Sequence, residues 1–248
     1  MSRVAVFARR NIKELLRSPI GWVFGLLLPI GIFVIMQVVL KSIPSGAENV
    51  PMFGVDRFTG GVVIFGASFL SLFCALVISS DCKQSFLSRL SVSPMTAGEF
   101  ICGYVLGVLP IAAAQIVITY AVALCFGLTV TVNILPAMLL SAVVSLLFVS
   151  IGVVMGSLLP EKNAPPLCSV VVQIAALLSG MWFDLDAIGG GFSVFCHVLP
   201  FAHAYDLIRY TLAGNYAEVW LPALVVALYT AAFAVCAVFA FKYRMKRL

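Results

Sequence analysis

The chain has 248 residues, of which 62% are hydrophobic and only 10% charged, and its mean hydropathy is +1.13. Soluble domains carry about 25% charged residues, so this composition excludes an ordinary soluble domain and indicates a protein that lies mostly in lipid. The net charge of +5 is distributed unevenly along the chain, so we interpret it as a signal of membrane orientation and expect no nucleic-acid partner.

Six apolar runs are long enough to cross a bilayer, because about 20 residues rising ~1.5 Å each span the hydrocarbon. Inside lipid every backbone N–H and C=O must be paired within its own segment, so each run should be an α-helix. We therefore expect an all-α, polytopic membrane protein that forms one domain over residues 1–248. The predicted transmembrane helices are 20–40, 60–80, 100–127, 134–159, 167–183 and 220–241.

A chain with six spans has both ends on the same side of the membrane. Twelve of the fifteen basic residues share that side, and only Lys41, Arg57 and Arg209 fall on the other. Basic residues accumulate on the cytoplasmic side of membrane proteins. We therefore expect both termini in the cytoplasm and the chain in a bacterial-type cytoplasmic membrane.

Residues 3–18 precede the first span and predict an amphipathic helix in the cytoplasmic interface. Apolar residues recur at helical spacing on one side, which we expect to face the acyl boundary, and charged residues occupy the other side. Two interpretations are open: a surface anchor that only fixes orientation, or an elbow that also borders a cytoplasmic partner. The basic residues available to such a partner are Arg9, Arg10, Lys13 and Arg17.

A polar, amphipathic stretch over residues 81–99 joins the second and third spans on the cytoplasmic side. Pro94 cannot continue a helix, and Thr96 and Glu99 have the spacing of a capping box that opens the next span. The stretch is either an ordinary connection or, since the chain has almost no other soluble mass, the contact for a partner that supplies energy. The candidate contact residues are Asp81, Lys83, Phe86, Leu87, Arg89, Leu90, Val92 and Pro94.

The predicted spans contain no charged residue, and their larger polar side chains are Gln37, Gln115 and Gln173. A channel or proton-coupled carrier usually has ionisable groups at depth. The scarcity of such groups favours an apolar route that is opened mechanically.

Two stripes of residues on the spans are candidates for that route or for a dimer seam. Small residues on the fifth span permit close approach of another helix and predict a seam. An apolar stripe on the second span either lines the route or simply packs against protein or lipid. The stripes contain Phe65, Phe69, Ser169, Gln173 and Gly180.

Residues 184–219 decide the number of spans. The part from 192 to 212 is apolar enough to cross, but Asp206 and Arg209 would each cost about 2.5–3.5 kcal/mol at mid-bilayer. We therefore predict an extracellular, re-entrant segment of one or two short helices that break near Pro200. Asp206 and Arg209 are three apart and can pair on a helix.

The same segment contains His197 and His203, near Asp184, Asp186 and Asp206. A metal or proton site is one interpretation, because ionisable groups in a membrane are often functional. The structural interpretation is preferred, with the histidines bonded to loop carbonyls and Asp184 and Asp186 in external water. We expect no metal.

Two motifs carry a resemblance to a known family. Ser88-Arg-Leu-Ser-Val-Ser-Pro-Met95 resembles the segment ending in Leu-x-Val-Ser-Pro that precedes the third helix of the ABC-2 type permeases, the membrane subunits of ATP-binding-cassette exporters. Leu178-Ser-Gly-Met-Trp-Phe183 and Leu199-Pro-Phe-Ala-His-Ala-Tyr-Asp-Leu-Ile-Arg209 are similar to that family's motifs around the re-entrant segment. The run beginning at Asp81 and the residue after Phe183 depart from the family pattern.

The resemblance implies a dimer of six-span halves, identical or paired with a sister permease, bound to two ABC ATPase subunits. It implies that helix 3–18 and loop 81–99 contact the ATPases, the loop as a coupling helix. It also implies that the second and fifth helices of the two halves line the route, under re-entrant helices. ATP and Mg²⁺ would be bound by the ATPases and no cofactor by this chain.

The motifs of catalysis are absent from the sequence. Gly189-Gly-Gly191 lacks the Lys of a phosphate-binding loop and is interpreted as a hinge. We therefore expect a non-catalytic permease subunit that exports an amphipathic or lipid-like substrate, such as a drug or antibiotic. The alternative is an ATP-independent channel or secondary transporter, which usually has inverted repeats.

Overall fold

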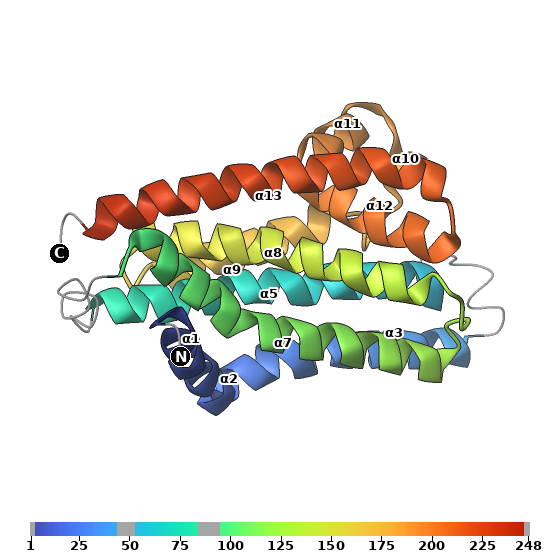
Figure 1. The fold of residues 1–248 in the computed structure, drawn as a ribbon. Coiled ribbons are helices and arrows are strands. Elements are labelled where there is room, and N and C mark those ends of the chain that lie inside the picture. The colour runs from blue at the N-terminus through green and yellow to red at the C-terminus, as the bar shows by residue number, and fades with distance from the viewer. Residues whose placement is uncertain (1–2, 44–52, 84–94, 246–248) are drawn as a thin grey trace.

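The computed structural model describes residues 3–43, 53–83 and 95–245, and this part of the chain is helical without a β-strand (Figure 1). The elements in chain order are α1 (Arg3–Arg17), α2 (Pro19–Trp22), the π-helical turn η1 (Val23–Leu27), α3 (Leu28–Ser42), α5 (Val55–Lys83), α7 (Ala97–Phe126), α8 (Ile134–Leu158), α9 (Ala164–Leu178), α10 (Leu185–Ile188), α11 (Gly190–Val198), α12 (Pro200–Ala213) and α13 (Tyr216–Met245).

Five stretches of helix in the described residues are long and apolar enough to cross a membrane, and α9 is apolar but only 15 residues long. The predicted all-α, polytopic fold is confirmed. The long helices run side by side, with α5 between its neighbours α7, α8 and α9 (Figure 1). α1 and the end of α13 lie at one end of the bundle, called the terminal end here, and α10, α11 and α12 lie toward the opposite end.

The α5–α8 contact is close because α8 presents glycines to it. A Cβ on Gly156 would lie 2.8 Å from the Cα of Ala75, and a Cβ on Gly152 would also meet the α5 backbone, at Ser71. Small residues at such positions let two helix backbones approach closely. α5, which also packs against α7, α9 and α12, is more completely buried than the other candidate spans in the described residues.

The helices extend beyond several predicted bounds. α5 covers 55–83 instead of 60–80, so the first three residues of the predicted loop 81–99 are helical, and α13 covers 216–245 instead of 220–241. Hydrophobicity marks the lipid-buried part of a helix, whereas the backbone hydrogen-bond ladder continues into polar residues. α9 instead ends five residues before 183, because Gly180 adopts φ +88°, which terminates a helix.

The first span was predicted as one continuous helix over 20–40 and is interrupted by η1. Pro29 follows this turn. Its missing N–H and its ring are incompatible with a regular bond to the carbonyl four residues earlier, at Gly25. A Cβ on Gly25 would also lie 2.8 Å from the ring of Phe73 in α5. The π-helical turn η1 therefore lies where the first span contacts α5.

The predicted re-entrant segment contains three short helices and turns. Leu199 is extended (φ −88°, ψ 150°) between α11 and α12, which confirms the predicted break at Pro200. Gly189 and Gly190 have positive φ where α10 meets α11, so the triple glycine is a tight junction there.

Candidate coupling site

α1 packs on α7 through its apolar face, so the expectation that this face lies in the acyl boundary is wrong for its central residues. The ring of Phe7 meets Phe100 and Tyr104 edge to face, with centroids 5.6 and 4.9 Å apart. Gly103 and Gly107 leave the space that α1 fills: a Cβ on Gly107 would lie 2.7 Å from the Cβ of Asn11. The sequence could not predict this contact, because it depends on two glycines about 90 residues away.

Asp81 lies in the last turn of α5 and points inward to α1 and α7. Arg10 binds its two carboxylate oxygens with both terminal nitrogens, each at 2.6 Å, and the hydroxyl of Tyr104 donates to Oδ2 at 2.8 Å. The Asp81 side chain is only 2% exposed. Two parallel N–H···O bonds between guanidinium and carboxylate make the most directional ion pair available to a protein. We call these three residues the Asp81 cluster.

The cluster also shifts the pKa of Arg10. The hydrogen bond to Asp81 raises the pKa of Arg10, against the opposing effect of burial. Arg10 reaches Glu14 on its own helix as well, at 2.9 Å. Arg10 was predicted to be available to a partner, and in the structure it is largely committed to Asp81.

The start of α7 is fixed by the predicted capping box, which is confirmed. Thr96 N–H donates to Glu99 Oε2 at 2.6 Å, and Glu99 N–H donates to Thr96 Oγ1 at 3.4 Å. The segment 84–94 therefore starts three residues after Asp81 and ends just before this cap. Both of its attachment points are ordered by specific side-chain contacts.

The predicted contact residues of the 81–99 loop have different outcomes. Asp81 was expected to meet a partner and is buried within the chain instead, while Lys83 is the last residue of α5. The remaining predicted residues lie outside the described residues: Phe86, Leu87, Arg89, Leu90, Val92 and Pro94.

The exposed face of α1 is basic. Arg9, Lys13 and Arg17 are exposed and, with Arg10 and Glu14, line an open hollow of about 580 Å³. This hollow lies at the terminal end, on α1, the helix whose Arg10 binds Asp81. A partner with acidic groups has a complementary surface here.

The residues of the two predicted stripes lie in different environments in the structure. Phe65 and Phe69 are buried in the core, which agrees with their alternative interpretation as packing residues. Ser169 and Gln173 are exposed on α9. Gly180 is not on that helix face, because it follows the end of α9 and is buried against Leu185 and Tyr205.

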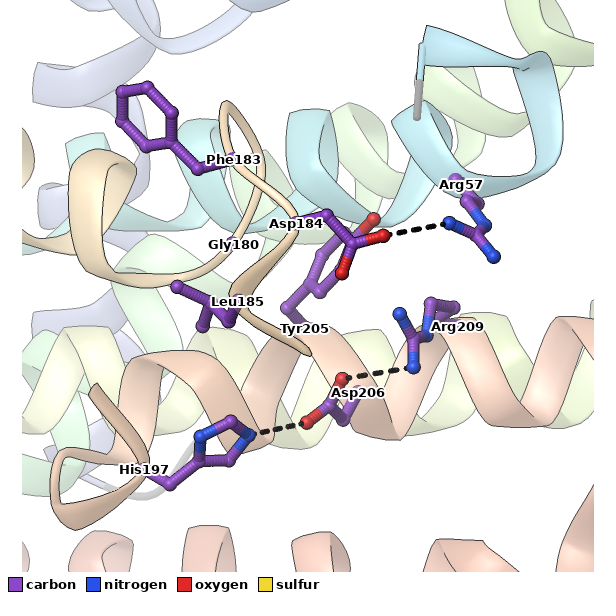
Figure 2. Close-up of a pocket in the computed structure, with 9 residues that line it drawn as sticks. All are labelled: Arg57, Gly180, Phe183, Asp184, Leu185, His197, Tyr205, Asp206 and Arg209. Atoms are coloured by element: carbon purple, nitrogen blue, oxygen red, sulfur yellow. Dashed lines mark hydrogen bonds and ion pairs between the residues drawn. The ribbon is translucent and has the colours of Figure 1, made fainter. Parts of the chain in front are cut away.

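A second cluster of charged residues joins α5 to the segment that contains α10, α11 and α12 (Figure 2). Asp206 lies 3.8 Å from Arg209 and 3.4 Å from His197, and Arg57 of α5 lies 3.4 Å from Asp184. The predicted Asp206–Arg209 pair is confirmed. Asp184 was expected in external water; its side chain is 36% exposed and also pairs with Arg57.

The histidines bond to carbonyls as predicted. His203 Nε2 lies 2.9 Å from the carbonyl of His197, and His197 Nδ1 lies 2.8 Å from the carbonyl of Ser193. Within the described residues, no group of three His, Cys, Asp or Glu side chains is arranged to hold a metal ion.

Comparison with known protein families agrees with these features. A family model described as ABC-2 type transporter matches residues 2–213, which is most of the chain. The match takes in α1, the Asp81 cluster and the re-entrant helices. No curated protein matches the chain. The chain therefore belongs to the ABC-2 type transporter family and is a multi-pass membrane permease of the ABC type.

Proposed function

We propose that the chain is the transmembrane subunit of an ABC exporter, driven by ATP that a separate ATPase subunit hydrolyses. On this proposal the chain is not catalytic, and ATP and Mg²⁺ are bound by the ATPase. The cargo is an amphipathic or lipid-like molecule, such as a drug or antibiotic. An apolar cargo is supported by the lack of charged residues in the predicted spans.

The observation that carries the proposal is the Asp81 cluster. It ties α1, α5 and α7 together where segment 84–94 begins, and α7 is capped where that segment ends. A force applied to the segment is therefore passed to three helices at once. This arrangement suits a protein that is moved by a partner bound at the terminal end.

α5 would carry that movement across the membrane. It is 29 residues long and packs against α8, α9 and, near its other end, α12 of the re-entrant segment. A packed helix moves as a rigid unit because protein interiors are close-packed. A shift at Asp81 would thus reach Arg57, in the first turn of α5, and its partner Asp184.

The assembly that we propose has two permease halves and two ABC ATPases. The terminal end is cytoplasmic, with both termini there, and the basic face of α1 and segment 84–94 contact the ATPases. The second half, identical or paralogous, packs against the exposed face of α9. Gln173 supports this interface, because a primary amide on an apolar helix is better satisfied by protein than by lipid.

Co-purification and transport by a reconstituted complex test the proposal. The tagged chain is co-expressed with an ABC ATPase encoded beside it, purified and placed in vesicles with a fluorescently labelled amphiphile. We expect the ATPase to co-purify and the dye-labelled amphiphile to move only with ATP. Replacing the Walker-A lysine of the ATPase should stop transport while the complex remains intact. Transport by the chain alone without ATP would instead identify the channel or secondary transporter.

A further inference from the structure

A cavity of about 570 Å³ opens at the end of the bundle opposite the termini. It is lined from four segments: the start of α5, the connection between α7 and α8, the end of α12 and the turn into α13. Its volume is within the range of small-molecule sites, about 300–1,000 Å³. We call it the arginine cavity, because Arg57 and Arg209 both line it.

These two arginines form the wall between the arginine cavity and the small pocket of Figure 2. Both line both spaces, whereas Asp184 and Asp206 line only the small pocket, of about 10 Å³. Asp184 lies 3.4 Å from Arg57, and Asp206 lies 3.8 Å from Arg209. Arg209 also donates to the hydroxyl of Tyr210, another lining residue of the arginine cavity, at 3.2 Å. A guanidinium has five N–H donors, so it can bind several acceptors at once.

Three long helices also begin at the cavity. The residue directly before each helix lines it: Gly54 before α5, Asn133 before α8 and Asn215 before α13. The N-terminus of a helix carries about half a positive charge, which is favourable for anions. The N–H groups of Ile134 and Tyr216, the first residues of α8 and α13, already donate to the carbonyls of Thr131 and Gly214. Because α5 and α13 have Asp56 and Glu218 in their first turns, the positive end of α8 is the least offset by acidic residues. The opposing end of α12 also lies here, but its last carbonyls accept bonds from Gly214 and Asn215.

The rest of the lining fits an anion with several acceptor oxygens. Thr129 and Thr131 contribute hydroxyl groups that can donate. Asp56 is the carboxylate among the lining residues, and it lies in the first turn of α5, where it opposes that helix's own dipole. Two of the three basic residues that the charge pattern assigns to this side of the membrane therefore meet at one cavity.

Aromatic residues near the cavity are those expected at a membrane surface. Tyr210 lines it, and Tyr216 donates to Asn133 at its edge with a 2.7 Å hydrogen bond. Trp220 follows one turn later on α13 and is 79% exposed. Tyr and Trp concentrate where lipid headgroups meet the hydrocarbon.

We propose that the arginine cavity binds the phosphate of an anionic amphiphile whose acyl tail stays in the adjacent leaflet. Arg57 and Arg209 contact the phosphate oxygens, the N-terminus of α8 adds to the positive field because its first turn has no acidic residue, and the threonine hydroxyls donate to the remaining oxygens. The proposed function and topology are needed only to say in which leaflet of the bilayer the acyl tail lies. The binding needs no ATPase.

Binding of short-chain lipids to the purified full-length chain in detergent tests this inference. The probes are dihexanoyl-phosphatidylglycerol, dihexanoyl-phosphatidylcholine and inorganic phosphate, measured by titration calorimetry. We expect the phosphatidylglycerol to bind at least tenfold tighter than the phosphatidylcholine. The double variant Arg57→Gln/Arg209→Gln should weaken phosphatidylglycerol binding at least tenfold. Lys41→Gln, which removes the third basic residue of the same side outside the cavity, should change it less than twofold.

The remaining outcomes separate the sources of phosphate. Competition by inorganic phosphate at equal affinity would overturn the requirement for an acyl tail and identify free phosphate, whereas absence of competition supports the lipid headgroup. A second variant, Thr131→Val/Asn215→Ala, removes polar groups from the cavity lining and leaves both ion pairs in place. It should weaken phosphatidylglycerol binding about threefold. This variant tests the site even if the arginine variants do not fold. Wild-type affinity in either cavity variant would contradict the site. Such a failure would leave the exporter proposal standing, because no ATPase is involved.

Discussion

Asp81 is a charged residue buried at the end of a membrane-spanning helix, and its partners account for its presence there. Burying an ionised carboxylate is unfavourable unless it is paired and hydrogen-bonded. Arg10 supplies two bonds and Tyr104 a third, from two other helices. The carboxylate therefore makes the position of α5 depend on α1 and α7.

Replacing Asp81 with Asn tests this dependence. Breaking a fully buried ion pair from one side costs about 3–5 kcal/mol, because the other charge loses its compensation. The cost should be smaller here, because Arg10 is 34% exposed and keeps its contact with Glu14. We expect Asp81→Asn to lower the unfolding midpoint of the purified chain clearly in a denaturant titration. Tyr104→Phe should lower the midpoint less, because it removes one hydrogen bond to a charged group, which contributes about 1.5–3 kcal/mol to the free energy of unfolding. Glu14→Gln is the control: its pair with Arg10 is partly exposed, so its loss should cost less than about 1 kcal/mol.

At Asp81 the sequence misled for a physical reason. A polar residue directly after an apolar run is typical of a loop that faces water. Its partner Arg10 lies 71 positions away, on a helix where alternation of charge indicates an exposed face. The pattern of neighbouring residues cannot predict an ion pair between residues so far apart in the sequence. Thr96 and Glu99 were predictable because a capping box is defined by neighbours three positions apart.

At the scale of elements, the glycines of α8 set how closely it approaches α5. Gly156→Leu would require space where the backbone of Ala75 lies 2.8 Å from the new Cβ, so backbone would have to move. We expect this variant to lose the monodisperse elution peak in size-exclusion chromatography. Gly31→Ala in α3 has no atom within 4 Å of the new Cβ and should elute as wild type. Normal folding of both variants would contradict the close α5–α8 contact.

The elements themselves were largely predictable. Length of apolar runs located the spans, and Pro200 located the junction of α11 and α12 because proline restricts the residue before it. The packing of α1 on α7 was not predictable, since an amphipathic helix can bury its apolar face in lipid or in protein. The choice was made by Gly103 and Gly107, whose missing side chains form the groove.

At the scale of the whole molecule, the seam between two permease halves remains a prediction. In a homodimer, cysteine at Gln173 should be crosslinked to its symmetry mate by a short bifunctional thiol reagent in membranes. The exposed native cysteines Cys102, Cys125 and Cys236 are first replaced by serine. Leu139→Cys, on the exposed face of α8, is the control and should stay monomeric on a denaturing gel. Equal crosslinking at both positions would exclude α9 as the specific seam.

The two ends of the molecule have different chemistry, joined by α5. The terminal end has the basic face of α1 and the Asp81 cluster, and the opposite end has the paired charges of the re-entrant helices and the arginine cavity. If the chain is driven as we propose, energy supplied at the first end must reach the second through packed helices. Loss of the Asp81 contact should therefore separate ATP consumption from movement of cargo.

The ratio of amphiphile transported to ATP hydrolysed, in vesicles containing the complete complex, tests that claim most directly. We predict that Asp81→Asn keeps at least half of the ATP hydrolysis of the wild type but lowers the ratio more than tenfold, while Glu14→Gln keeps both. An unchanged ratio in an Asp81→Asn complex that still hydrolyses ATP would contradict transmission of force through this cluster.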